Sequence, residues 1–211
     1  MNERWVIRGL DRVASPALLV RPRVVETNVE RMIDLCGGPE RLRPHVKTHK
    51  MDAVVRIQIS AGVRKFKAST IAEVEMCLAA GAKDVLLAYS PVGPAPVRLI
   101  RLAEAYTDAK LSFLADEEPA LSAINKRCLK AGVQLGVFID FDCGMGRTGT
   151  SSEEEVVKIA ELADSSGSLR FEGVHCYDGH VRESDPEARR KIWSQAMSTV
   201  DGVLERLAEA R

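Results

Sequence analysis

Short apolar runs alternate with amphipathic stretches along most of the chain. Such runs are typical of strands buried in a parallel sheet, whereas the stretches between them repeat apolar residues at helical spacing. The predicted strands are 17–20, 42–48, 65–69, 85–89, 111–115, 133–141 and 169–177. The predicted helices are 24–35, 51–60, 71–80, 97–105, 117–130, 152–163 and 186–210.

The regular alternation of strands and helices predicts an α/β fold with a parallel sheet. Thr70 and Glu73 form a capping box at one helix start, and Gly81 and Gly132 follow two helix ends. The chain has no GxGxxG turn, so a (β/α)8 TIM-type barrel is favoured over a doubly wound sheet. A closed barrel has eight strands, and seven are predicted. Either the first predicted strand is mistaken, or the chain stops before the barrel is complete.

Composition narrows the class of protein. The 211 residues are 45% hydrophobic and 28% charged, and their formal net charge is zero. A general nucleic-acid binder would show a basic excess, and we expect neither nucleic acid nor membrane as a partner. The N-terminus has no apolar run long enough for a secretory signal. The five cysteines form no CxxC pair, so free thiols and a cytoplasmic location are expected.

Basic side chains cluster in the sequence RLRPHVKTHK at residues 41–50. Alternation along a strand places Arg43, His45, Lys47 and His49 on one side and Lys50 on the other. A buried strand tolerates such a row only when the row faces a polar cavity. The alternative is a strand end that frays into solvent.

Two further predicted strand ends carry polar or aromatic side chains that could bind a ligand. Asp142 opens a glycine-rich loop, DCGMGRTG, in which Arg147 either binds an anionic oxygen or is simply solvated. Tyr177, which shares a strand face with His175, either stacks on a flat cofactor or belongs to the core. Four histidines and two aspartates also allow a zinc or manganese site, but HxH and HExxH spacings are missing.

These segments together resemble the D-threonine aldolase and D-serine dehydratase-like family of pyridoxal-phosphate enzymes, which have the alanine-racemase-type (fold type III) barrel. The order and spacing agree over nearly the whole chain, and the RPHVKTHK stretch is the most specific part. The matching segments are SPALLV at 15–20, RPHVKTHK at 43–50, TIAE at 70–73, DCGMGRTG at 142–149 and YDGH at 177–180.

The resemblance implies that a lysine of the KTHK stretch attaches pyridoxal 5'-phosphate covalently. Of the two candidates, Lys47 is preferred over Lys50 because it shares a strand face with the histidines, and burial among cations favours a neutral amine. The implied positions of the remaining residues are Arg147 beside the phenolic oxygen of the cofactor, Tyr177 stacked on its ring, His45 beside the cofactor, and His49, His175, His180 and Asp142 in substrate contacts or behind the cofactor.

The family also has a phosphate-binding loop after the next barrel strand and a C-terminal β domain that binds a divalent metal of the Mn or Zn type. By this comparison residues 1–211 form an incomplete cofactor-binding barrel domain, and we expect the metal from the missing domain and a homodimer at full length. The implied function is a lyase for D-3-hydroxy amino acids, most closely a D-threonine aldolase-like cleavage to glycine and an aldehyde. D-serine dehydratase-like activity, amino-acid racemase activity and a non-catalytic pyridoxal-phosphate-binding protein are alternatives, and a metal-dependent hydrolase barrel is an alternative from another class.

Overall fold

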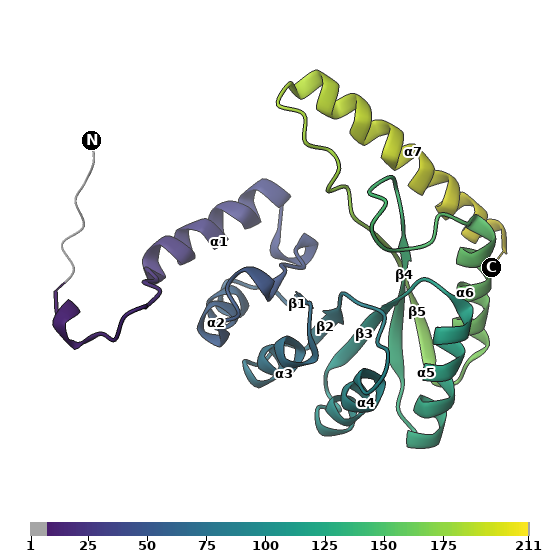
Figure 1. Cartoon of the computed structure of the whole chain (residues 1–211), viewed down its shortest axis with the longest axis horizontal. Helices are drawn as coiled ribbons and strands as arrows, with labels where there is room; N and C mark the ends of the chain where they lie inside the picture. Colours follow the sequence, from purple (N-terminus) through teal and green to yellow (C-terminus); the bar gives the residue numbers. More distant parts are fainter. Residues whose placement is uncertain (1–7, 211) are drawn as a thin grey trace.

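Five parallel strands form one sheet in the computed structural model, which describes residues 8–210 (Figure 1). The strands are β1 (Lys65–Ala68), β2 (Asp84–Leu87), β3 (Lys110–Ala115), β4 (Leu135–Phe141) and β5 (Leu169–Cys176). The α-helices are α1 (Pro22–Cys36), α2 (Asp52–Ser60), α3 (Ile71–Ala79), α4 (Ala95–Ala105), α5 (Glu118–Ala131), α6 (Glu153–Ser165) and α7 (Pro186–Ala210). Three short 3-10 helices, η1 (Leu10–Arg12), η2 (Pro39–Arg41) and η3 (Val46–Thr48), lie among the N-terminal elements.

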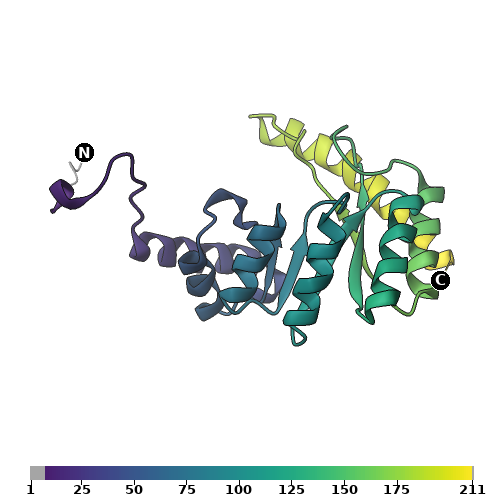
Figure 2. The ribbon, with the colours of Figure 1, turned by 60° about the horizontal axis from the view of Figure 1, so that its bottom comes forward.

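The strand order in the sheet is the same as the order along the chain, and every neighbouring pair is parallel. Helices α2 to α6 form an arc along one side of the sheet, and α7 lies against α6 (Figures 1 and 2). A doubly wound sheet would instead reverse its strand order and carry helices on both sides. The strand order therefore confirms the barrel-type fold, with five strands in residues 8–210 in place of the predicted seven.

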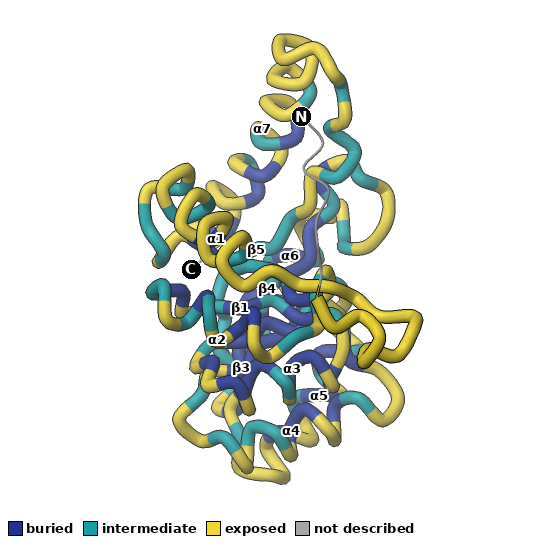
Figure 3. The backbone as a smooth tube through the Cα atoms, turned by 90° about the vertical axis from the view of Figure 1, so that its left-hand side faces the viewer, coloured by how far each residue is buried: buried dark blue, intermediate teal, exposed yellow. Residues whose placement is uncertain are grey.

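The main core lies between the sheet and this arc of helices. Buried backbone, drawn dark blue in Figure 3, is concentrated in the strands and in the helices packed on them. Phe66, Phe113, Val137 and Ile139 point to the helix side and are inaccessible to solvent. No helix within residues 8–210 has the length and the apolar character that crossing a lipid bilayer requires.

The predicted strand at 17–20 is wrong. The segment pairs with no strand among the described residues, and the side chain of Leu18 is 76% exposed. Figure 1 shows it leading away from the sheet toward the N-terminus. An apolar run forms a strand only where a neighbouring strand accepts its backbone hydrogen bonds, and this segment has no such neighbour.

The predicted strand at 42–48 is also wrong. The only strand-like contact in this segment is a bridge between His45 and Lys67, where the Lys67 N–H donates to the Pro44 carbonyl at 2.9 Å. Pro44 has no N–H of its own to continue a ladder. After His45 the chain turns into η3, in which the His49 N–H donates to the Val46 carbonyl at 3.1 Å. The alternation of side chains that the sequence predicts for 43–49 therefore ends at His45.

The capping box at the start of α3 is confirmed on one side only. The Thr70 Oγ1 accepts a hydrogen bond from the Glu73 N–H at 3.2 Å, as an N-cap should. The Glu73 carboxylate does not reach back to Thr70, however. It accepts from the Ser69 N–H at 2.7 Å and is buried. Glu73 thereby ties the end of β1 to α3.

Candidate active site

A cavity of about 780 Å³ opens at the carboxyl ends of the strands, on the side of the sheet opposite the helices. It is lined by Arg43, His45, Lys47, Lys67, Ser69, Ala88, Tyr89, Ser90, Leu114, Asp116, Asp140, Arg147, Thr148, His175 and Tyr177. Four of these side chains are Lys or Arg and two are Asp, so the lining favours a ligand that carries negative charge. Parallel α/β folds bind ligands at this edge of the sheet.

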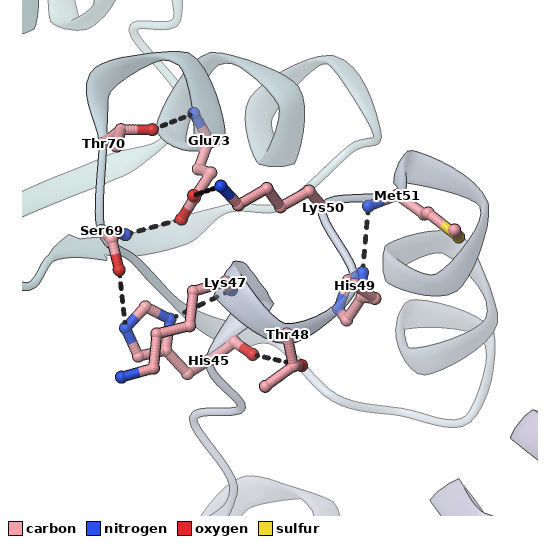
Figure 4. Close-up of polar contacts among 9 residues, drawn as sticks. All are labelled: His45, Lys47, Thr48, His49, Lys50, Met51, Ser69, Thr70 and Glu73. Carbon is pink, nitrogen blue, oxygen red and sulfur yellow. Dashed lines mark hydrogen bonds and ion pairs between the residues drawn. The ribbon is translucent and has the colours of Figure 1, made fainter. Parts of the chain in front are cut away.

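Lys47 and Lys50 lie in different surroundings. Lys47 lines the cavity, whereas the Lys50 Nζ lies 3.6 Å from a Glu73 carboxylate oxygen. Figure 4 shows Lys50 reaching toward Glu73, with Lys47 beside His45 and directed away from that pair. Lys47 and not Lys50 therefore lies at the cavity, and the η3 turn, not strand alternation, places it there. Lys47 is exposed, so the expected burial of its amine is not observed.

His45 borders the cavity in a fixed orientation. Its Nδ1 accepts a hydrogen bond from the Lys47 N–H at 3.3 Å, and its Nε2 lies 3.2 Å from the Ser69 hydroxyl (Figure 4). Burial, together with the charges of Lys47 and Lys67, lowers the pKa of His45 from 6.5 to about 4. The imidazole is therefore neutral at physiological pH and adds no positive charge to the cavity.

His49 is placed elsewhere. Its Nδ1 accepts from the Met51 N–H at 3.0 Å, and it is not among the cavity-lining residues. Its Nε2 is buried and has no hydrogen-bond partner within residues 8–210. Burial lowers the pKa of His49 as well. The structure does not bring His49 together with Lys47 and His45 at the cavity wall.

The loop between β4 and α6 is held by backbone contacts. The Asp142 carboxylate accepts hydrogen bonds from the Gly144 and Gly146 N–H groups at 2.9 and 3.0 Å. Asp142 therefore shapes the loop and does not line the main cavity. The loop returns to the end of β4 at Gly149, whose φ of +96° suits glycine and whose Cα faces the Asp140 carbonyl closely.

Arg147 and Tyr177 meet at the cavity wall. The Arg147 guanidinium lies over the Tyr177 ring, 4.6 Å from its centroid, and both residues line the cavity. Tyr177 is 42% exposed, so it is not a core residue. This contact orients the planar donor group of Arg147 along the cavity edge.

His180 packs under the same loop. A Cβ on Gly144 would lie 3.1 Å from the His180 Nε2, and the His180 Nδ1 is buried without a hydrogen-bond partner in the described part of the chain. His180 does not line the cavity. Within residues 8–210 no group of three or more His, Cys, Asp or Glu side chains is arranged to hold a metal ion.

Lys67 and Asp140 line the cavity although sequence reasoning did not select them. The Lys67 Nζ lies 2.5 Å from the His175 Nε2, and the His175 Nδ1 lies 2.7 Å from an Asp140 carboxylate oxygen. Burial lowers the pKa of Lys67, and Lys47, Arg147 and Arg43 lower it further, against the opposing charge of Asp140. Burial alone would raise the pKa of Asp140, but hydrogen bonds from His175 and Thr148 outweigh it and lower that pKa.

A one-residue bulge places His175 beside Asp140. The β4–β5 register shifts between Val137 and Phe138, so that Asp140 pairs with His175. As a result Phe171 and Val174, three positions apart, both pack against the core, and His175 turns to the cavity. Gly173 permits this with a φ of +137°. A polar residue followed by glycine within a predicted strand was the available sign of the bulge.

Comparison with known proteins finds a matching family and similar enzymes. A family described as alanine racemase, N-terminal domain, matches residues 20–210. The 3-hydroxy-D-aspartate aldolase of Paracoccus denitrificans is 31% identical over 188 residues, which are 87% of this chain and 48% of that protein.

Solved structures agree with this result. The D-threonine aldolase of Filomicrobium marinum superposes with a TM-score of 0.84 at 26% identity, covering 95% of this chain and 54% of that one. The D-threo-3-hydroxyaspartate dehydratase of a Delftia species gives 0.77 at 29% identity, covering 94% and 52%. The chain thus spans about half the length of these relatives.

Proposed function

Since this chain belongs to the alanine racemase N-terminal domain family, we propose that its cavity binds pyridoxal 5'-phosphate and serves a lyase that acts on D-3-hydroxy amino acids. The observation that carries the proposal is Lys47, a primary amine at a cavity that otherwise presents Arg147, Tyr177 and a neutral His45. Relatives named for aldolase or dehydratase reactions on such substrates support it.

The residues present fit the cofactor. An aldehyde needs an amine for attachment, a phenolic oxygen needs a cationic donor, and a pyridine ring needs a flat neighbour. Lys47, Arg147 and Tyr177 offer these three groups at one cavity. When bound, pyridoxal phosphate acts as an electron sink for the substrate carbon attached to it.

The side chains of the cavity then have distinct tasks. Lys47 would hold the cofactor through its primary amine, and the amino group of the substrate would take its place. Arg147, held against Tyr177 at 4.6 Å, donates to an anionic oxygen. His45, neutral and bonded to Ser69, fixes the backbone that carries Lys47. Arg43 forms an ion pair with Asp84 at 2.5 Å, which neutralises that carboxylate.

Retro-aldol cleavage of a D-threonine-like substrate to glycine and an aldehyde is the reaction we propose. Water elimination is the second candidate, because the dehydratase from Delftia shares the fold at 29% identity. A divalent metal of the Mn or Zn type and a homodimer are part of the proposal. The described residues do not offer a metal-binding group, so no step is derived through a metal.

Attachment of the cofactor is tested by borohydride reduction of the loaded chain and peptide mass spectrometry. The phosphopyridoxyl group should appear on Lys47, disappear in Lys47→Ala and persist in Lys50→Ala, since Lys50 is turned to Glu73. Attachment at Lys50, or no attachment to the wild-type chain, would contradict the assignment.

The reaction is tested by product analysis. D-Threonine should give glycine and acetaldehyde. Ammonia without glycine, from D-threonine or D-serine, would rule out the aldolase in favour of the dehydratase.

A further inference from the structure

We propose that Lys67 is a second catalytic lysine of this cavity, one that carries the proton exchanged at the substrate Cα, and that His175 and Asp140 are its positioning residues. The inference rests on the proposed function for the identity of the substrate. Its physical basis is a chain of three side chains from three strands, β1, β4 and β5, which the sheet brings to one wall of the cavity.

The chain of contacts is short and shielded from water. The side chains of His175 and Asp140 are only 12% and 10% exposed, and their Nδ1–oxygen distance is 2.7 Å. An ionised carboxylate can only accept, so the His175 Nδ1 carries the hydrogen and donates it to Asp140. In the neutral ring the His175 Nε2 is then an acceptor, and the Lys67 Nζ, 2.5 Å away, donates to it.

This arrangement lets a proton leave Lys67 while the positive charge stays close to the Asp140 carboxylate. When it moves, the Nζ–H bond breaks, its electron pair stays on Nζ, and a new N–H bond forms on the His175 Nε2. The imidazolium formed in this way faces the Asp140 carboxylate, so the net charge of the three groups is unchanged. Lys67 thus alternates between an ammonium and a free amine at the cavity surface.

The other cations of the cavity cannot take this role. The guanidinium groups of Arg43 and Arg147 do not deprotonate in proteins. Lys47 is the attachment point. Burial and three neighbouring cations lower the pKa of Lys67. The charged and titratable groups around Lys67 are Arg43, His45 and Lys47 from the segment before α2, Asp140 and Arg147 from β4 and its loop, and His175 from β5.

The position of Lys67 favours Cα as the reacting atom. Lys47 and Lys67 are close enough for their charges to repel, and the substrate nitrogen that replaces Lys47 is bonded directly to Cα. In the retro-aldol reaction the Cα–Cβ bond breaks, the 3-hydroxyl loses its proton, and Cα gains one. The Lys67 ammonium supplies the proton to Cα and becomes a free amine. The proton released by the 3-hydroxyl returns to the Lys67–His175 pair, so that Lys67 is again an ammonium.

The coupling is tested first without cofactor, by following the Lys67 ¹³Cε chemical shift against pH in the isotope-labelled chain. Groups that interact by more than about one pH unit titrate in two joint steps. Lys67 should show two steps in the wild-type chain and one step in His175→Gln. A single, unchanged step in both proteins would overturn the relay, whatever the cofactor does.

Catalysis is tested with the loaded chain by exchange of a glycine Cα proton for deuterium. Lys67→Met and Lys67→Gln should retain borohydride-fixed cofactor on Lys47 but lose about a hundredfold or more in exchange rate. Lys67→Arg restores the charge but releases no proton, so it should not recover the rate. Lys65→Met is the matched control, because Lys65 lies two residues earlier on the same face of β1 and does not line the cavity; its rate should be that of the wild type.

The outcomes separate the two proposals. A wild-type chain that takes up no cofactor contradicts the proposed function, and the titration then decides on the relay. Cofactor on Lys47 together with wild-type exchange in Lys67→Met, recovery in Lys67→Arg, or no exchange in the wild-type chain would overturn the role of Lys67.

Discussion

Acidification is expected to destabilise the fold through His45. Burial, together with the charges of Lys47 and Lys67, lowers the pKa of His45 from 6.5 in the unfolded chain to about 4 in the folded one. Between these values the unfolded imidazole binds a proton and the folded one does not. Stability from this group is therefore complete above pH 6.5 and is lost as the pH falls through 4.

The size of the effect follows from the same change in pKa. A fall from 6.5 to about 4 corresponds to at most about 3 kcal/mol of unfolding free energy. The imidazole is only partly buried, and solvent screening weakens such interactions. We therefore expect a contribution of about 1–2 kcal/mol.

The measurement is urea unfolding of the wild-type chain and of His45→Gln at about pH 7 and about pH 4. Glutamine keeps an acceptor for the Lys47 N–H but cannot bind a proton. The wild-type chain should lose about 1–2 kcal/mol more than the variant on acidification, and effects of carboxylates and other histidines cancel in the difference. A difference between the two proteins that does not change with pH would refute the reasoning.

Two structural substitutions should also be informative. Gly149→Ala would place a Cβ 2.8 Å from the Asp140 carbonyl at a φ of +96°, so we expect a loss of about 1–3 kcal/mol from backbone strain, measured by urea unfolding, and weaker binding of pyridoxal 5'-phosphate, measured by calorimetry. Unchanged stability would mean that the loop relaxes. Thr70→Ala removes the acceptor for the Glu73 N–H and should cost about 1 kcal/mol, seen as a lower Tm; Thr70→Ser, which keeps the hydroxyl, should not lower it, and an equal loss in both would argue against capping.

Local pattern was sufficient for most of the fold. Five predicted strands and all seven predicted helices are present, with ends displaced by a few residues. The ends of β1, β4 and β5 carry the residues that line the cavity, as strand-end chemistry in a parallel sheet predicts. Apolar periodicity is a local property, since it records which face of each segment is buried.

The local pattern predicted strands wrongly where pairing between distant segments decides whether a strand forms. The segments 17–20 and 42–48 resemble strands by their local pattern, but one pairs with no described strand and the other is interrupted at Pro44 and turns at η3. The preference for Lys47 over Lys50 therefore rested on a strand that does not form. What separates these two lysines is the turn after His45 and the ion pair of Lys50 with Glu73.

The sequence by itself determined the α/β alternation, the resemblance to pyridoxal-phosphate enzymes and the segments that supply chemistry. The tertiary structure decided which side chains of those segments meet. Lys67 and His175 are 108 positions apart, and His175 and Asp140 are 35 apart. Their contacts depend on strand register and on one bulge in β5. Register is set by hydrogen bonds between segments distant in sequence, so no local pattern contains it.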